Sequence, residues 1–261
     1  MINTIYVPPA AEPVHLNEMK LHSRIDADAD NALISALISA SRVHAENVLG
    51  RAIIAQTRKL FLDSFPSDEI QLPGPPLISV SSVEYLDLDG TTQTLADSVY
   101  TVDTDSEPGR IFLADLQSWP STKFAPKAVT ITYVCGYATP FTANATDDKL
   151  TWASRTPVNG SLIRLTNSGG ELPSPLAVET NYYVVSASGQ TCKLALTAGG
   201  DAIDILSAGS GTHFIGEVPA PIISAIKMRA AMLYENREGQ VDKNAVAAVE
   251  NLLWPFRILE F

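Results

Sequence analysis

Residues 30–57 read DNALISALISASRVHAENVLGRAIIAQT, and most of this stretch predicts one long amphipathic helix. Between Ala32 and Leu49 large apolar side chains recur at helical spacing, and they are Leu33, Ile34, Leu37, Ile38, Val43, Val48 and Leu49. Gly50 is placed to end the helix, because glycine adopts the left-handed conformation common after a helix C-terminus. Asp30 or Asn31 is expected to cap the N-terminus.

Three further helices are expected, at about residues 16–24, 219–236 and 243–253. One amphipathic helix cannot bury its apolar stripe alone, so the helices from the two ends of the chain are expected to pack on each other. Between residues 56 and 137 the pattern changes to short β-branched and aromatic runs separated by Pro, Gly and Asp. These runs are typical of strands, and Asp87-Leu88-Asp89-Gly90 is typical of a hairpin turn.

Residues 138–216 differ in composition from the rest of the chain. They hold nine of the fifteen glycines and ten threonines, with only four basic residues. KLTWAS, SLIRLTN, NYYVVSAS, TCKLALT and AIDIL within this range are typical of strands in a small all-β module. The prediction is an α+β fold in which 1–137 and 217–261 form a core from both chain ends, and 138–216 is an inserted all-β domain.

The overall composition excludes several classes of protein. The chain has 261 residues, 46% of them apolar, and a formal charge of −11, which predicts a soluble globular protein rather than a disordered one. No window approaches the roughly 18 apolar residues of a membrane span, and Met1 to Pro13 lacks the features of a signal peptide. A sequence pI near 4.7 argues against affinity for nucleic acid phosphates.

No local motif indicates catalysis. Cys135 and Cys192 fall in different strand-like runs, and the four histidines, His15, His22, His44 and His213, are scattered. Asp26, Asp28 and Asp30 have the spacing of a calcium loop, but the required Gly and Glu are replaced by Asn31 and Leu37. The prediction is therefore a protein that is not an enzyme and has no catalytic residues, cofactor or metal.

Several ordered elements together resemble the head-tail connector (adaptor) proteins of long-tailed double-stranded DNA phages. They are VHLNEMKLHSRID, the helix quoted above, SEPGRIF followed by SWP, AVTITYVCGY, and VPAPIISAIKMRAAMLYENRE. The resemblance covers residues 14–137 and 217–256. The family pattern passes from the YVCGY strand almost directly into VPAPI, and residues 141–214 are similar instead to a β-rich module of phage tail and fibre proteins.

The resemblance implies a structural role in the neck of a virion that is assembled in the host cytoplasm. Such a protein forms a ring, commonly of twelve copies, under the portal protein, extends the DNA channel and docks a stopper or tail-terminator protein. Double-stranded DNA would pass through it without specific binding, and no membrane is involved. Ring formation needs apolar surface beyond the subunit core, and the candidates for it are the spare apolar positions of the helix at 32–49 and the terminal tail.

Two groups of residues are candidate sites. Five large apolar side chains follow the last helix and are candidates for docking to the portal, namely Trp254, Phe256, Ile258, Leu259 and Phe261. The alternative is that this tail folds back onto its own helices. Residues 60–109 contain ten acids and no Lys or Arg, which is most simply a solvated face. In a ring, Asp103, Asp105 and Glu107 are candidates to line the channel and repel phosphates.

A second hypothesis places the function in the all-β module. The protein would then be a virion-surface protein that binds a carbohydrate, a receptor or another virion protein. The aromatic residues available for such a site are Trp152, Tyr182 and Tyr183. Aromatic residues in strands usually belong to the core, so the connector hypothesis is favoured.

Overall fold

The computed structural model describes residues 1–153, 156–178, 180–237 and 243–258. The chain forms two compact units. The sandwich unit comprises Met1–Pro9 and Ala55–Gly136, and the helix–barrel unit comprises Ala10–Ile54 and Tyr137–Phe261. Helices and sheets are both present, which confirms the α+β class.

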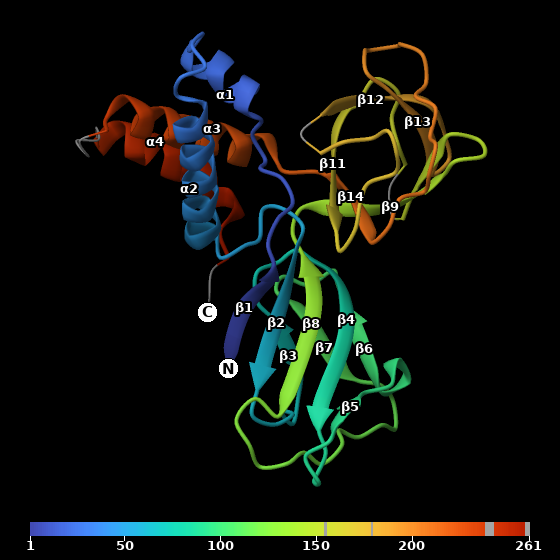
Figure 1. Ribbon diagram of the computed structural model, residues 1–261. Coiled ribbons are helices and arrows are strands. Elements are labelled where there is room, and N and C mark those ends of the chain that lie inside the picture. The colour runs from blue at the N-terminus through green and yellow to red at the C-terminus, as the bar shows by residue number, and fades with distance from the viewer. Residues whose placement is uncertain (154–155, 179, 238–242, 259–261) are drawn as a thin grey trace. The chain divides into compact units, whose positions relative to one another are not determined.

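Four helices from the two ends of the chain lie together in the helix–barrel unit (Figure 1). They are α1 (Leu16–Ser23), α2 (Asn31–Leu49), α3 (Ala220–Glu235) and α4 (Lys243–Leu253). Their apolar side chains share one core, to which α2 gives Ile34 and Ile38, α3 gives Ile226, and α4 gives Leu253. Each of these four side chains is at least 98% buried, so α2 packs on helices that follow it by about 170 residues.

The two ends of α2 are held differently. At the C-terminus Gly50 has φ +67°, which is the expected left-handed cap. At the N-terminus Asp30 occupies the cap position, but its side chain makes no capping hydrogen bond. The carboxylate of Asp30 instead accepts hydrogen bonds from the Tyr234 hydroxyl at 2.6 Å and from Arg237. Asp30 thus occupies the predicted cap position without a side-chain capping bond, and its carboxylate ties α2 to the end of α3.

Two antiparallel sheets form the sandwich unit. The larger has the order β1 (Ile2–Val7), β2 (Gln56–Leu62), β8 (Val129–Cys135), β4 (Leu77–Leu86) and β5 (Thr92–Thr94). The smaller has the order β3 (Ile70–Leu72), β7 (Gly109–Leu113) and β6 (Tyr100–Asp103). Leu60 and Ile131 of the larger sheet and Ile111 of the smaller sheet are fully buried. Figure 1 shows the smaller sheet behind the larger one.

The sequence pattern identified most strands of this unit but missed two at its edges. The sequence INTIYV was not recognised as strand β1, and TQT was not recognised as β5. The turn at Asp87 was predicted correctly, because Gly90 donates its N–H to the Asp87 carbonyl and the Asp87 carboxylate accepts N–H groups from Asp89 and Thr91.

The remaining strands form a closed barrel that begins at Ala138 and ends at Gly216. They are β9 (Ala138–Asn144), β10 (Lys149–Trp152), β11 (Leu162–Ser168), β12 (Asn181–Ser188), β13 (Thr191–Ala195) and β14 (Thr212–Gly216). The barrel closes where β14 pairs with β9, and Gly216 lies opposite Ala138. Tyr137 donates its N–H to Ile53 and accepts one from Glu217, so three distant parts of the chain meet beside the barrel.

The sequence pattern was less accurate for the barrel. The strands β9 and β14 were missed, and AIDIL, residues 202–206, is irregular rather than a strand. The backbone N–H groups of Ile203, Ile205 and Leu206 bind Leu194, the Asp148 carboxylate and Ser174, respectively. Because these acceptors belong to three different segments, no strand ladder forms there.

Gly109 gives a test of how the two sheets of the sandwich unit meet. A Cβ atom added at Gly109 would lie 2.5 Å from the side chain of Leu77 on the other sheet. We expect Gly109→Ala to lower the free energy of unfolding by about 1–3 kcal/mol, because the packed interior cannot absorb the methyl group. Chemical denaturation would measure this change.

Gly216→Ala is the matched control, since a Cβ at Gly216 meets only the Arg164 carbonyl at 3.8 Å. This substitution should change the free energy of unfolding much less. Equal effects of the two substitutions would contradict the close packing of Gly109 on Leu77.

Candidate docking surfaces and the acidic loop

An ion cluster holds two buried charged residues of α2, Arg42 and Glu46. The Arg42 guanidinium donates to Glu12 at 2.7 Å and to Glu46, one turn later, at 2.8 Å. The other carboxylate oxygen of Glu46 accepts the backbone N–H of Ile53 at 3.0 Å. The side chains of Arg42 and Glu46 are only 10% and 7% exposed, so each charge depends on its partners. The cluster connects α2 to the segments before and after it.

The apolar tail begins as a short 3₁₀ turn, Trp254–Phe256, directly after α4. The Phe256 side chain packs on the helical core, and its carbonyl accepts a hydrogen bond from Arg51. The backbone N–H of Ile258 donates to the Leu49 carbonyl at 2.9 Å, which satisfies a carbonyl at the end of α2. This part of the tail therefore folds back onto its own helices.

Trp254 differs from the rest of the described tail. Its side chain is 62% exposed, and the Arg257 guanidinium lies 5.6 Å from the ring centroid. Ile258 is half-buried, while Leu259 and Phe261 lie outside the described residues. The three described candidates thus do not form one exposed surface, and Trp254 is the most accessible of them.

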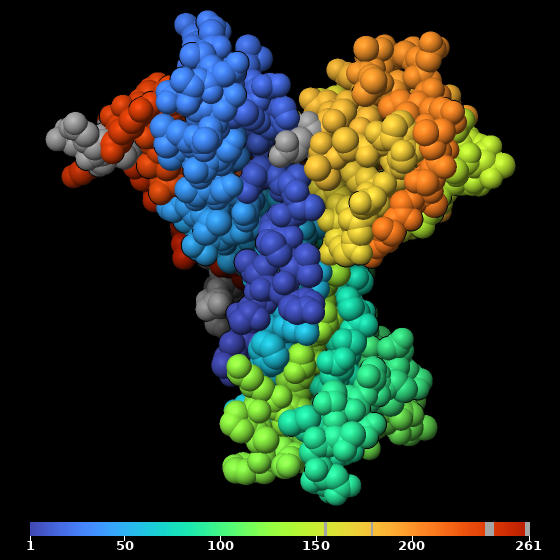
Figure 2. Space-filling view, in the orientation of Figure 1, coloured from blue at the N-terminus to red at the C-terminus, as the bar shows by residue number. Residues whose placement is uncertain are grey.

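The outward face of α2 consists mainly of small side chains. Its exposed residues are Ala32, Ser35, Ala36, Ala40, Val43 and Asn47. Of the apolar stripe that predicted this helix, Val43 alone is exposed, at 45%. In Figure 2 the near surface of α2, in blue, is not covered by other segments of the chain. Small side chains of this kind allow the backbone of another helix to approach closely.

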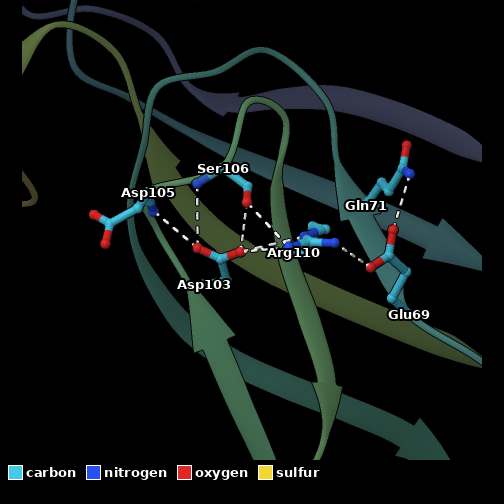
Figure 3. Close-up of polar contacts among 6 residues, drawn as sticks. All are labelled: Glu69, Gln71, Asp103, Asp105, Ser106 and Arg110. Carbon is cyan, nitrogen blue, oxygen red and sulfur yellow. Dashed lines mark hydrogen bonds and ion pairs between the residues drawn. The ribbon is translucent and has the colours of Figure 1, made fainter. Parts of the chain in front are cut away.

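The candidate acidic residues lie at the end of β6 and in the loop that follows it, and Asp103, the last residue of β6, is held by a hydrogen-bond network (Figure 3). The Asp103 carboxylate accepts the Ser106 hydroxyl, the backbone N–H groups of Asp105 and Ser106, and the Arg110 guanidinium at 2.8 Å. Arg110 also pairs with Glu69 at 2.9 Å. Hydrogen bonds from Ser106 and Arg110 hold the pKa of Asp103 well below its usual range.

This network separates the three candidate acids. Asp103 fixes the loop and shares its charge with Arg110, whereas the side chains of Asp105 and Glu107 are exposed. The acid-rich window 60–109 ends one residue before Arg110. A charge count inside that window therefore leaves out the cation that pairs with two of its members, Glu69 and Asp103.

The two cysteines and two of the four histidines are either buried or take part in local hydrogen bonds. Cys135 and Cys192 are both buried, and burial raises the pKa of the Cys192 thiol to about 11. The His213 ring lies between Asn167 and the Ala208 carbonyl, and His15 caps α1 by accepting the Asn17 N–H. Within the described part of the chain, no three His, Cys, Asp or Glu side chains are arranged to hold a metal ion.

No helix in the described ranges combines the length and the hydrophobicity that a membrane crossing requires.

The aromatic residues of the barrel do not form an exposed platform. Trp152 is 5% exposed and Tyr182 is 2% exposed, and both side chains belong to the barrel core. The Tyr182 hydroxyl accepts the N–H of Ala177 at 2.8 Å. Tyr183, the third candidate, is half-buried.

Residues 13–84 match the family described as "Phage gp6-like head-tail connector protein". The resemblance to head-tail connectors is confirmed. The connector-matching segment, residues 13–84, contains α1, α2, β2, β3 and most of β4, and it includes Arg42, Glu46 and Arg51. The remainder of the resemblance proposed from the sequence lies outside this range. A comparison with curated proteins gives no match.

Solved structures extend the likeness in fold to the whole chain. "Neck of empty GTA particle computed with C6 symmetry" matches with a TM-score of 0.60 and 16% identity, covering 100% of this chain and 97% of that chain. "Virion of native gene transfer agent (GTA) particle" gives 0.58 and 16%, with the same coverage. "Neck of native GTA particle computed with C12 symmetry" gives 0.54 and 15%, again with 100% and 97% coverage. At these identities the likeness concerns the fold alone.

The Asp103 network predicts a pH effect. Because the pKa of Asp103 is depressed in the folded state, the pairing stabilises the fold above the ordinary aspartate pKa. This stabilisation is lost as the pH falls toward the folded-state pKa. We expect Arg110→Gln to raise the pKa of Asp103 toward its ordinary value, so the stabilisation should be smaller and its loss should be complete at a higher pH. An NMR titration of the side-chain carboxyl carbons would measure this pKa.

Asp87 is the internal reference for this titration, because hydrogen bonds from Gln93 and Thr91 lower its pKa without any contribution from Arg110. The pKa of Asp87 should be the same in both proteins. An unchanged pKa of Asp103 in Arg110→Gln would mean that Ser106 and the backbone hold the carboxylate without the guanidinium.

Proposed function

We propose that the protein is a structural component of the neck of a tailed phage or phage-like particle, where it acts as a head-tail connector. The observation that carries this proposal is the connector match over residues 13–84. That range contains α2 together with Arg42 and Glu46 of the ion cluster, and Arg51, which binds the tail. The likeness in fold to two neck structures and a virion of gene transfer agent particles supports the same role.

In this role, copies of the chain form a ring, which we propose contains twelve subunits and lies under the portal protein. The symmetries named for the similar neck structures, C6 and C12, support a ring of this size. A ring requires two different faces of one subunit to contact each other in successive copies. The small-residue face of α2 is the candidate for one of these faces, because it leaves room for a helix of the neighbouring copy.

The ring would extend the DNA channel and give the next neck protein, a stopper or tail terminator, a surface to bind. Double-stranded DNA would pass without specific binding, and assembly would take place in the host cytoplasm. No catalytic step is part of this proposal. The barrel, Ala138–Gly216, would be an insertion into a connector core formed by 1–137 and 217–261, which is supported by the pairing of its first and last strands.

The alternative role, a virion-surface protein that binds through the barrel, has weaker support. The burial of Trp152 and Tyr182 leaves the barrel without the exposed aromatic rings that sugar-binding sites commonly use. The barrel is more simply a stabilising or spacing module in the neck.

Portal binding tests the proposed function, and the tail allows a specific variant. Purified wild-type protein mixed with the purified portal ring should form a complex whose mass, measured by native mass spectrometry, corresponds to a ring of subunits on the portal. A protein that is monomeric alone is compatible with the proposal, whereas failure to bind the portal would contradict it. Trp254→Ala should weaken binding by roughly 30-fold, the typical effect of losing an interfacial tryptophan.

Two further variants distinguish docking from folding. Phe256→Ala should lower the free energy of unfolding by roughly 2 kcal/mol, because Phe256 packs on the helical core. Leu21→Ala removes an exposed apolar side chain from α1 and should change neither the portal affinity nor the free energy of unfolding. Wild-type portal affinity in Trp254→Ala would remove this tryptophan from the docking site and leave the ring proposal standing.

The channel proposal can be tested without disturbing the Asp103 network. Among Asp103, Asp105 and Glu107, we expect the exposed Asp105 and Glu107 to face the channel, where their charges would repel DNA phosphates. The double variant Asp105→Lys, Glu107→Lys should slow genome release from assembled particles while leaving ring formation on the portal unchanged. Time-resolved fluorescence of a DNA-binding dye would measure release, and an unchanged rate would rule out the channel role.

A further inference from the structure

Three connections lie at one end of the sandwich unit, where β2 and β4 end and β8 begins (Figure 1). The longest of them, residues 114–128, joins β7 to β8. It lies against the turn between β4 and β5, because Lys123 donates its N–H to the Leu86 carbonyl at 3.0 Å. The Lys123 ammonium lies 2.7 Å from the position that a Cβ of Gly90 would occupy.

This end of the unit exposes three large apolar side chains, which we call the loop-end patch. The exposed fractions are 70% for Leu88, 95% for Leu116 and 107% for Phe124, so the last two make almost no contact within the chain. Single exposed apolar residues are common on protein surfaces. Three on neighbouring connections at one end of a unit are typical of a surface that another molecule covers.

The backbone conformation at Leu116 is unfavourable for a leucine, so its exposure needs an explanation. Leu116 has φ +61° in a turn closed by a hydrogen bond from the Gln117 N–H to the Ala114 carbonyl. Left-handed backbone costs a residue with a Cβ roughly 1–2 kcal/mol, and glycine or asparagine is the usual choice at such positions. The leucine side chain gains almost no burial within the chain in return. Nothing in the fold of this unit therefore accounts for a leucine here.

The connection that carries the patch is anchored to the unit. The Trp119 ring stacks on Phe65 with a centroid distance of 4.8 Å, and Phe65 contacts the edge of Tyr85. Leu86 donates its N–H to the Ala128 carbonyl at 2.8 Å, which fixes the far end of the connection. Leu116 and Phe124 are thus presented on a supported loop, which lowers the entropy lost on binding.

The charges around the patch indicate the kind of partner. The three connections carry two ammonium groups, Lys123 and Lys127, and six carboxylates, namely Asp63, Asp68, Glu69, Asp87, Asp89 and Asp115. The balance is negative, which opposes contact with an anionic lipid surface. The same balance favours a protein cleft that is apolar at its centre and bordered by Lys and Arg.

We propose that the loop-end patch docks into an apolar cleft with a basic border on another neck or tail protein of the same particle. The proposal rests on the proposed neck function and adds the surface through which the protein would join the tail. Leu116 and Phe124 enter the cleft, and the surrounding carboxylates pair with the basic groups at its border.

The test compares heads that carry wild-type protein with heads that carry the double variant Leu116→Asn, Phe124→Ser. Asparagine tolerates the left-handed backbone of residue 116, so the temperature of unfolding should not fall. Purified tails of the same particle are the probe, and negative-stain counting of joined particles is the measurement. We expect the variant to reduce the rate of joining by at least about tenfold.

Leu206→Asn is the matched control. It replaces a leucine of the helix–barrel unit, and this leucine is 68% exposed. Heads carrying this variant should join tails at the wild-type rate. Equal joining by the double variant, or equal loss in the control, would overturn the proposal. A change in the size of the free protein in the double variant would assign the patch to self-association and would also overturn it.

The outcomes of binding to vesicles and to the portal separate this proposal from a membrane role and from failure of the proposed function. Binding of the wild-type protein, but not the double variant, to vesicles of phosphatidylcholine and phosphatidylglycerol would assign the patch to a membrane and overturn the proposal. Failure of the wild-type protein to bind the portal would overturn the proposed function itself. Portal binding with normal tail joining by the double variant would overturn the patch alone.

Discussion

The apolar stripe of α2 has to be covered, and the helices that cover it lie at the other end of the chain. A nineteen-residue helix with buried Ile34, Ile38 and Leu49 is not stable in water by itself. In the sequence, its partners α3 and α4 follow both sheets of the sandwich unit and the whole barrel. Everything between Leu49 and Ala220 must therefore bring the chain back to where it left the helices.

The strand registers meet this requirement. The sandwich unit is entered through β2 and left through β8, and these strands pair so that Gln56 lies opposite Cys135. The barrel is entered at Ala138 and left at Gly216, which also lie opposite each other. The backbone hydrogen bonds of Tyr137 to Ile53 and Glu217 join the three passages of the chain. Each all-β part thus begins and ends at neighbouring points.

The sequence predicted the features that depend on local periodicity. The helix α2 and its Gly50 cap follow from residue spacing and from the backbone freedom of glycine. The strands β1 and β14 were missed although they hold six and five residues, because each stands beside proline or glycine and is fixed by pairing with a distant strand. The irregular segment 202–206 has a strand-like composition, but its hydrogen-bond partners come from three different segments.

For the candidate sites, too, the sequence predicted what residue type and spacing determine, but not what contacts between distant residues determine. Five large apolar residues are evident in the tail sequence, yet only the structure separates the exposed Trp254 from the packed Phe256. The ion pairs of Asp103 and Glu69 with Arg110 join residues that a count of charges in one window treats separately. The loop-end patch gave no signal in the sequence, because neither backbone dihedral angles nor exposure can be read from residue types.

The pairing of the first and last barrel strands has a consequence for how such chains diversify. Because Ala138 and Gly216 are neighbours, exchange of the segment between them by recombination would leave the ends of the helical part the same short distance apart. The helices and their Arg42 cluster would not have to adjust to the new segment. The barrel is therefore the region in which related genes could substitute a different module while the helical part is inherited unchanged.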